Sequence, residues 1–158
     1  MSSVILPGSY DPVTLGHLEI IERAAKEFDE VYVVAFINPN KTYTFSVEER
    51  VKMLILATDE LENVIVSYSD GLVIDYMREH GIQKIVKGYR NDEDLKWERV
   101  QAEYNLKNGG FETELWLCRD EMKSVSSTAV RELLKDGKSA ADLLPHAVEG
   151  YIKSLGTK

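Results

Sequence analysis

Cationic and hydroxyl side chains follow short apolar runs at four places in the chain. They are Ser9 and His17 after residues 4–6, Lys41 after 31–37, Lys87 and Arg90 on either side of Gly88-Tyr89 after 85–86, and Ser126, Ser127 and Thr128 after 115–117. Cations, hydroxyls and the free amides at the start of a helix all bind phosphate oxygens. If the chain brings the four segments together, we expect them to form a polyphosphate site.

The apolar pattern switches repeatedly between continuous runs and helical spacing. Strands are predicted at residues 4–6, 31–37, 64–66, 85–86 and 115–117, and helices at 18–28, from 47 onward, at 72–80, 92–107 and 130–134, and after Pro145. Pro7-Gly8 is expected to end the first strand, and Ser46 with Glu49 to cap the second helix. Strands that alternate with helices indicate a parallel sheet. The prediction is an α/β fold, a Rossmann-like doubly wound five-stranded parallel sheet with helices on both faces, in a single domain of residues 1–158.

The buried faces of the helices are predicted from the same spacing. Leu18, Ile21 and Phe28 are expected in the core. In a parallel sheet the ligand lies beyond the carboxyl ends of the strands, so the segments after the first, second, fourth and fifth strands should carry the chemistry.

Each of these residues also has a simpler interpretation. Residues 126–128 could only cap a helix, His17 could only hold a helix end, and Lys41 could be a solvated loop lysine. Lys87 and Arg90 could pair with the nearby carboxylates of residues 92–94. The joint placement of all of them at one sheet edge favours the phosphate site.

Composition excludes several classes of protein. The 158 residues carry 27 acidic and 19 basic side chains, a net charge of −8, which argues against a general nucleic-acid binder. The single Cys118 excludes an internal disulfide and a cysteine-based zinc site. No apolar run is long enough for a membrane span, and the first residues do not resemble a signal peptide. The GxGxxG and GxxxxGK(S/T) phosphate motifs are absent. We therefore expect a cytoplasmic protein with another kind of phosphate site.

Two segments carry a family resemblance. PGSYDPVTLGH resembles the (H/T)xGH signature of the nucleotidylyltransferase superfamily, and SVSSTAVR resembles its second signature. Together with Lys41 and the KGYRNDEDLKWE segment, in this order and spacing, they resemble the bacterial phosphopantetheine adenylyltransferases. The resemblance extends from about Val4 to the LLPHAVEGYI segment, nearly the whole chain.

The resemblance implies transfer of the AMP part of ATP to 4′-phosphopantetheine, giving dephospho-coenzyme A and pyrophosphate. It also implies Mg²⁺, a cytoplasmic location and a homohexamer. The ATP contacts it implies are Ser9, Tyr10, His17, Gly88, Tyr89, Arg90, Glu98, Met122, Lys123, Ser124, Val125, Ser126, Ser127 and Thr128. The acceptor contacts it implies are Ser9, Lys41, Val73 and Lys87, and no residue is implied as a metal ligand.

The residue types suit such a reaction. The acceptor is already an anion, so no enzyme nucleophile or strong base is needed, and catalysis should consist of positioning and charge stabilisation. His17 would donate to the α-phosphate, Lys41 would hold the attacking phosphate and Ser9 would orient both. Arg90 and the hydroxyls of residues 126–128 would hold the leaving pyrophosphate.

Ser9, Tyr10, Leu15, Lys87 and Trp97 depart from the usual family residues, and two of these changes affect polar contacts. Leu15 stands where asparagine is usual, and Lys87 stands where arginine is common, which removes the forked contact that arginine makes with phosphate. Two other functions remain open. A related enzyme could use nicotinate mononucleotide or glycerol phosphate as acceptor. A non-catalytic module that senses adenylate is the alternative from another class of protein.

Overall fold

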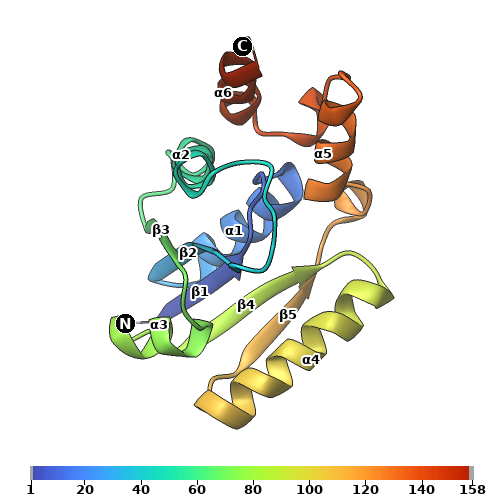
Figure 1. The fold of residues 1–158 in the computed structure, drawn as a ribbon. Helices are drawn as coiled ribbons and strands as arrows, with labels where there is room; N and C mark the ends of the chain where they lie inside the picture. The colour runs from blue at the N-terminus through green and yellow to red at the C-terminus, as the bar shows by residue number, and fades with distance from the viewer. Residues whose placement is uncertain (1, 157–158) are drawn as a thin grey trace.

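Strands and helices alternate along residues 2–156, the part of the chain that the computed structural model describes (Figure 1). The strands are β1 Ser3–Gly8, β2 Glu30–Phe36, β3 Val64–Ser69, β4 Lys84–Tyr89 and β5 Thr113–Leu117. The helices are α1 Leu15–Glu27, α2 Val47–Ala57, α3 Val73–His80, α4 Asp92–Gly109, α5 Ser127–Lys135 and α6 His146–Gly156, with 3-10 turns η1 Asp120–Met122 and η2 Ala141–Leu143. The strands pair in parallel in the order β3-β2-β1-β4-β5, which confirms the predicted fold class.

Two core clusters lie on opposite faces of this sheet. Alternate side chains of a strand point to opposite faces, so Val4 and Leu6 of β1 pack in the cluster that contains Ile21 of α1. Ile5 packs in the other cluster, with Met77 of α3. Helices α2, α5 and α6 add residues to the first cluster, while α4 packs along β4 and β5 (Figure 1).

Strand β1 continues through Pro7 and Gly8, so the prediction that the strand ends after residue 6 is wrong. Pro7 pairs in register with Val34 of β2, but the pairing of β1 with β4 stops at Ile5. The Pro7 carbonyl accepts a hydrogen bond from the Lys87 ammonium of β4, at 3.1 Å, instead of from a backbone amide. The amide hydrogen that proline lacks is therefore not needed, since Pro7 lies where β1 has already separated from β4.

The buried face of α1 differs slightly from the prediction. Ile21 is fully buried and Phe28 packs against the core, as expected, but Leu18 belongs to neither cluster. Glu19 is buried in its place, and its carboxylate accepts hydrogen bonds from the Arg119 amide and the Arg23 guanidinium. These two donors explain how a carboxylate is accommodated inside the fold.

Helix α2 also turns an unexpected side chain inward. Its start is as predicted, because the Ser46 hydroxyl accepts from the Glu49 amide and the Glu49 carboxylate accepts from the Ser46 amide. Arg50, however, is only 2% exposed, whereas Ile55 is 46% exposed.

No helix in residues 2–156 has both the length and the apolar character that a membrane span requires.

Candidate active site

The candidate site lies between β1 and β4, where the order of the strands reverses. The chain winds from β1 through β2 to β3 in one direction and then continues with β4 and β5 in the other. Ligands of open parallel sheets bind at such a reversal, beyond the carboxyl ends of the strands. A cavity of about 340 Å³ occupies this position and extends to the starts of α1, α4 and α5.

Most of the side chains singled out in the sequence meet in this cavity. Its lining includes Ser9, Tyr10, His17, Lys41, Lys87, Gly88, Tyr89, Arg90, Glu98, Val125, Ser126, Ser127 and Thr128. Val73 lines a second, adjoining cavity of about 920 Å³. Met122, Lys123 and Ser124 line neither cavity, and the Lys123 ammonium pairs with Asp120 at 3.2 Å.

The two cavities share one wall. The shared residues are Pro7, Gly8, Ser9, Lys41, Lys87 and Glu98. On the far side of this wall the larger cavity is flanked by apolar side chains, among them Phe36, Val73 and Trp97. The smaller cavity is flanked by helix starts and hydroxyls, which suit phosphates. The site can therefore hold a phosphorylated ligand on one side and a partly apolar ligand on the other, with cations between them.

His17 is held by its own helix start. Thr14 is the N-cap of α1, and its hydroxyl accepts from the His17 amide at 3.4 Å. The Nδ1 atom of the His17 ring lies 3.0 Å from the Thr14 amide nitrogen, which can only donate. Nδ1 is therefore the acceptor, and the proton of the neutral ring lies on Nε2. His17 thus caps the helix with one ring nitrogen and keeps the other as a donor.

Tyr10 fixes the His17 ring from the side. The two rings meet edge to face with 4.9 Å between their centroids, and the Tyr10 hydroxyl donates to the Leu6 carbonyl at 2.8 Å. Tyr10 has a φ of 50°, a left-handed conformation that is strained for a residue other than glycine. Burial raises the pKa of its hydroxyl well above the usual range. Tyr10 is therefore a neutral, fixed support for His17.

The pKa of His17 is lowered to about 4, mainly by burial and further by the positive charges of Lys87 and Arg90. The ring is therefore neutral at pH 7 and donates a hydrogen bond without carrying a full charge. A neutral donor of this kind stabilises charge that builds up on a phosphate oxygen, and it needs no rearrangement to do so.

We expect the His17 ring to remain neutral down to about pH 4 in the free protein, with Nδ1 unprotonated. Nitrogen-15 NMR of the three histidines over pH 3.5–8 measures both properties. Because the unfolded chain would bind this proton near pH 6.5, the free energy of unfolding should fall as the pH drops from 6.5 towards 4. A His17 titration near pH 6.5 would show that the ring is not buried as described.

Two of the cations at the site are already paired with carboxylates. The Lys87 ammonium lies 3.4 Å from Glu98, and the Arg90 guanidinium makes two hydrogen bonds to Asp94, at 2.9 and 3.3 Å. Burial raises the pKa of Glu98, and the nearby Lys87 opposes this shift. The second Glu98 oxygen, Oε1, is buried without a hydrogen-bond partner. The pairing that the simpler interpretation of Arg90 predicted is therefore present, and it involves Asp94.

Two further cations have no carboxylate partner within residues 2–156. Lys41 contacts the Ser9 hydroxyl at 3.3 Å. Arg131 of α5 donates to the Asp11 carbonyl at 2.8 Å and contacts the Thr128 hydroxyl at 3.1 Å. Arg131 was not among the residues predicted for the site. The signal was its position three residues after Thr128, which places both on one side of the helix.

The hydroxyls at the start of α5 are divided between two roles. Ser126 is the N-cap and accepts from the Ala129 amide at 3.0 Å, so the capping interpretation is correct for this residue. Ser127 donates to the Pro12 carbonyl at 2.7 Å and so attaches α5 to the loop after β1. Gly16 allows the start of α1 to lie close to the segment before α5, because a Cβ at this position would lie 3.3 Å from the Val125 carbonyl oxygen.

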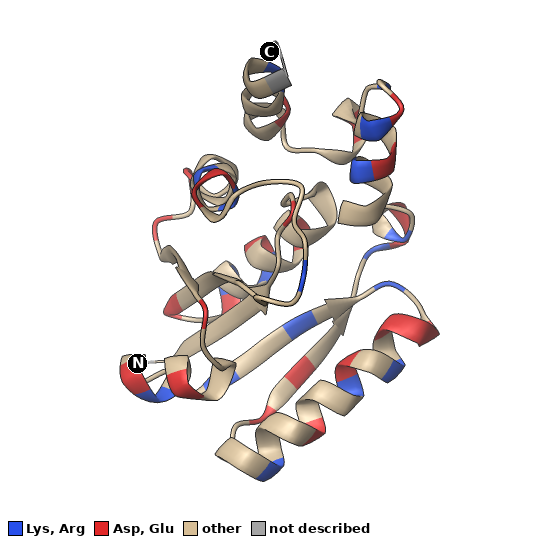
Figure 2. Cartoon of the chain, viewed as in Figure 1, with Lys and Arg blue, Asp and Glu red and all other residues tan. Residues whose placement is uncertain are grey.

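The charge of the cavity differs from that of the whole protein. Its wall contains four cations (Lys41, Lys87, Arg90 and Arg131) against three carboxylates (Asp11, Asp94 and Glu98). The chain as a whole has a net charge of −8, and Figure 2 shows acidic residues over most of its helices. The local excess of positive charge favours an anion here.

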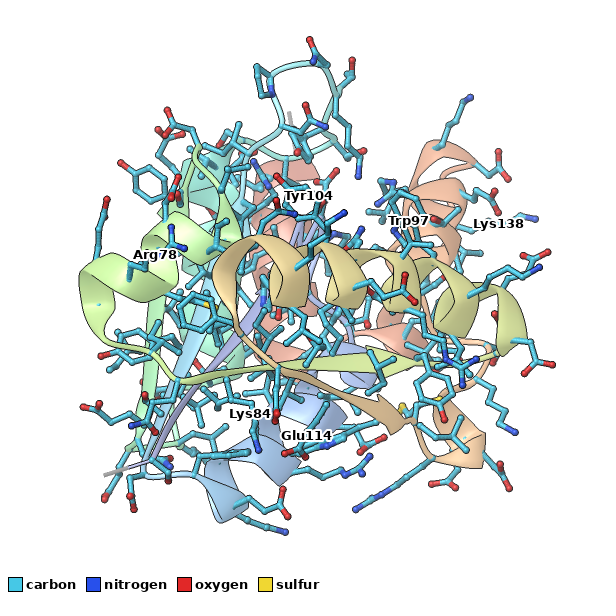
Figure 3. All side chains as sticks on the ribbon, turned by 90° about the horizontal axis from the view of Figure 1, so that it is seen from below. Arg78, Lys84, Trp97, Tyr104, Glu114 and Lys138 are labelled. Atoms are coloured by element: carbon cyan, nitrogen blue, oxygen red, sulfur yellow. The ribbon has the colours of Figure 1, made fainter. Side chains whose placement is uncertain are left out.

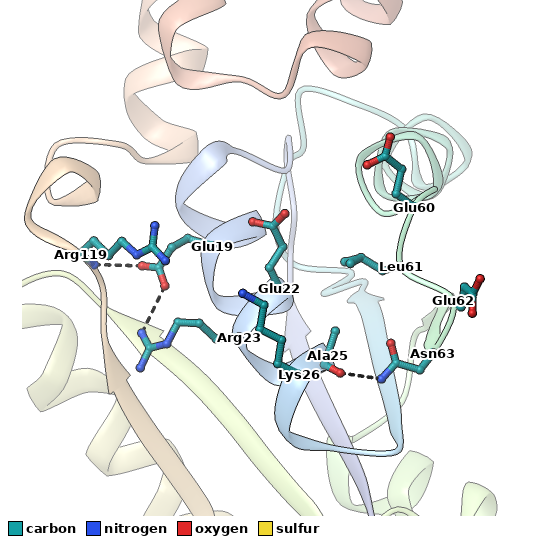
Figure 4. Close-up of a pocket in the computed structure, with 10 residues that line it drawn as sticks. All are labelled: Glu19, Glu22, Arg23, Ala25, Lys26, Glu60, Leu61, Glu62, Asn63 and Arg119. Atoms are coloured by element: carbon teal, nitrogen blue, oxygen red, sulfur yellow. Dashed lines mark hydrogen bonds and ion pairs between the residues drawn. The ribbon is translucent and has the colours of Figure 1, made fainter.

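Another hollow, beside α1, does not have this character (Figure 4). Its rim carries the exposed carboxylates of Glu22, Glu60 and Glu62. Two of its polar groups are used by the fold itself: Glu19 binds Arg23 and the amide of residue 119, and Asn63 donates to the carbonyl of residue 25 at 2.8 Å. Its four carboxylates (Glu19, Glu22, Glu60 and Glu62) outnumber its three cations (Arg23, Lys26 and Arg119), so the hollow has no excess of positive charge that would favour an anion.

Comparison with known proteins agrees with this site. Residues 5–133 match the cytidylyltransferase-like family, so the fold and the helix-start pocket define a nucleotidylyltransferase. The chain is also 45% identical over 146 residues to a phosphopantetheine adenylyltransferase from Symbiobacterium thermophilum, over 92% of this chain and 90% of that relative. The protein belongs to the phosphopantetheine adenylyltransferase family, within the cytidylyltransferase-like class.

Proposed function

We propose that the protein transfers the adenylyl group of ATP to 4′-phosphopantetheine, giving dephospho-coenzyme A and pyrophosphate in coenzyme A biosynthesis. The family membership supports this reaction. The observation that carries the assignment to this site is the shared wall of the two cavities, where Ser9, Lys41 and Lys87 face both. Two anionic substrates would meet at this wall, with their phosphates together and their other parts in separate cavities.

The bond changes need no covalent enzyme intermediate. A phosphate oxygen of 4′-phosphopantetheine attacks the α-phosphorus of ATP, and the bond from that phosphorus to the bridging oxygen of the β-phosphate breaks. Pyrophosphate leaves with the electron pair. The enzyme supplies geometry and charge stabilisation, which together account for large rate enhancements.

The residues have separate roles in this proposal. His17 donates from Nε2 to the α-phosphate, and Lys41 with Ser9 holds the attacking phosphate. Arg131 and the amides at the start of α5 hold the leaving pyrophosphate. Arg90 joins them, although its pairing with Asp94 reduces the charge that it offers. Lys87, held by Glu98 and the Pro7 carbonyl, offers a point charge between the substrates.

Mg²⁺ is part of the proposal as a companion of ATP. No three His, Cys, Asp or Glu side chains within residues 2–156 are placed to bind a metal together. Mg²⁺ binds readily through phosphate oxygens and water with few protein ligands, so this donor set fits an ion that enters with the nucleotide. When bound, it would neutralise part of the phosphate charge.

The domain, the assembly and the compartment are proposals as well. We propose one nucleotidylyltransferase domain over residues 1–158, because α6 packs on α2 and joins the main core. We propose a cytoplasmic homohexamer on the family resemblance. The exposed apolar side chains of α4 support a contact between subunits, since Trp97 is 62% exposed and Tyr104 51% (Figure 3). Light scattering measures the mass of the assembly in solution.

Incubation of the protein with ATP, Mg²⁺ and 4′-phosphopantetheine should release pyrophosphate and form dephospho-coenzyme A in equal amounts. Coupled pyrophosphate detection and mass spectrometry measure the two products. Parallel reactions use nicotinate mononucleotide, glycerol 3-phosphate, and pantetheine without its phosphate, and a further reaction omits Mg²⁺. Turnover of another acceptor in preference to 4′-phosphopantetheine would overturn the assignment, and no turnover of any acceptor would favour the adenylate sensor.

A further inference from the structure

Arg50 is a buried cation that lacks a counter-ion. It is 2% exposed and is among the largest fully buried side chains of the protein. Within residues 2–156 no carboxylate forms an ion pair with it, and its Nε atom has no hydrogen-bond partner. A buried charge is costly unless it is paired, so an arginine in this position calls for a reason beyond the filling of space.

The guanidinium of Arg50 reaches the carboxyl ends of two strands. Its Nη1 atom donates to the Ser9 carbonyl, just after β1, at 2.8 Å, and lies 3.5 Å from the Phe36 carbonyl at the end of β2. Ser9 belongs to the wall that the two cavities share. One side chain from α2 therefore ties the site-forming end of β1 to the neighbouring strand.

Arg50 also contacts the loop that carries Lys41. The central carbon of its guanidinium lies 4.0 Å from the centre of the Tyr43 ring, and the Lys41 ammonium lies 5.4 Å from the same ring centre. The Tyr43 hydroxyl accepts from the Asn38 amide at 2.8 Å, which fixes the ring against the start of the loop. Cations at these distances are attracted to the face of an aromatic ring. Tyr43 thus links Arg50 to Lys41.

Arg50, Tyr43, Lys41 and Ser9 form a ring of contacts beside the position proposed for the acceptor phosphate. Arg50 contacts the Ser9 carbonyl on one side and the Tyr43 ring on the other. The Lys41 ammonium completes the ring of contacts, because it lies 3.3 Å from the Ser9 hydroxyl. We propose that Arg50 is a positioning residue for the acceptor phosphate, because it fixes the distance between the Ser9 hydroxyl and the Lys41 ammonium. The proposal rests on the acceptor role proposed above for those two residues.

Arg50→Met removes the charge and the hydrogen bonds while keeping an unbranched side chain. We expect KM for 4′-phosphopantetheine to rise about tenfold or more, since small misplacements of binding groups have effects of this size, while KM for ATP stays within about twofold. Arg50→Lys keeps the charge but lacks the planar guanidinium that lies over the Tyr43 ring while it donates to the Ser9 carbonyl, so it should recover only part of the loss. Lys52→Met removes an exposed cation from the same helix and should leave both KM values unchanged.

A purely structural role predicts a different result. Fewer folded molecules would lower the apparent kcat and leave both KM values as they were, and this outcome would overturn the proposal, as would equal changes in the two KM values. Circular dichroism and thermal melting report whether each variant folds. If Arg50→Met does not fold, Arg50→Lys decides alone, and KM values for it equal to those of the wild type would overturn the proposal.

A binding experiment separates this proposal from the proposed reaction. Calorimetry compares 4′-phosphopantetheine with pantetheine as probes of the wild type and of Arg50→Met. We expect the variant to lose about tenfold in affinity for the phosphorylated probe and nothing for the other. If the wild type binds the phosphorylated probe without turnover, the reaction is refuted while Arg50 is still tested. Equal losses for the two probes, or no binding by the wild type, would refute the role of Arg50.

Discussion

His17→Ala should lower kcat by about 10²–10³, the usual effect of removing a preorganised donor to a charge that develops in the transition state. ATP affinity should change much less, because the neutral Nε2 donor contributes most when negative charge builds up on the α-phosphate. Steady-state kinetics with ATP and 4′-phosphopantetheine give kcat, and calorimetry gives the affinity for ATP. An equal loss in ATP binding would mean that His17 only holds the nucleotide.

A second substitution separates catalysis from helix capping. The His17 ring also accepts from the Thr14 amide, so His17→Ala should lower stability by about 0.5–2 kcal/mol, as the loss of a cap does. Glutamine is a natural partner in a capping box and should restore this contact in His17→Gln. We expect His17→Gln to recover the melting temperature without recovering kcat. Recovery of both would assign the loss in His17→Ala to the helix start.

The order of elements could be predicted from the sequence because most local signals agreed with the final fold. The alternation of apolar runs and helical spacing indicated the parallel sheet, and α3 ends at His80 as predicted, before Gly81 at a φ of 66°. Pro7 was misinterpreted because its lack of an amide hydrogen usually ends a strand. Whether that hydrogen is needed depends on β4, which comes almost eighty residues later in the chain.

The buried charges could not be predicted from periodicity. Helical spacing favours Ile55 as a core residue and Arg50 as a solvated one, and the structure reverses the two. Glu19 is likewise buried. Such a side chain becomes stable inside only when the fold brings donors or acceptors from distant segments, such as the Ser9 carbonyl for Arg50 and the Arg119 amide for Glu19. Local patterns contain no information on these partners.

Most of the side chains predicted for the candidate site lie together in the cavity, but their pairing was not predicted. The residues were identified because parallel strands bring their carboxyl ends together. Which cations are neutralised depends on geometry: Arg90 and Lys87 meet carboxylates on α4, while Lys41 and Arg131 do not within residues 2–156. For His17, the two interpretations set against each other in the sequence are compatible, since Nδ1 caps the helix while the residue also lines the cavity.

The unpaired charge of Lys41 leads to the second large expected effect. Lys41→Met should lower kcat/KM for 4′-phosphopantetheine by about 10²-fold, because no carboxylate within residues 2–156 competes for this ammonium, which is proposed to hold the acceptor phosphate. KM for ATP and the melting temperature should change little, since the side chain is exposed.

Lys26→Met, which removes an exposed lysine of α1, is the matched control for lost charge. Lys41→Arg should retain much of the activity, and the wild-type advantage should shrink at high salt, which screens exposed charges. Equal kcat/KM values for Lys41→Met and Lys26→Met would remove Lys41 from the acceptor site.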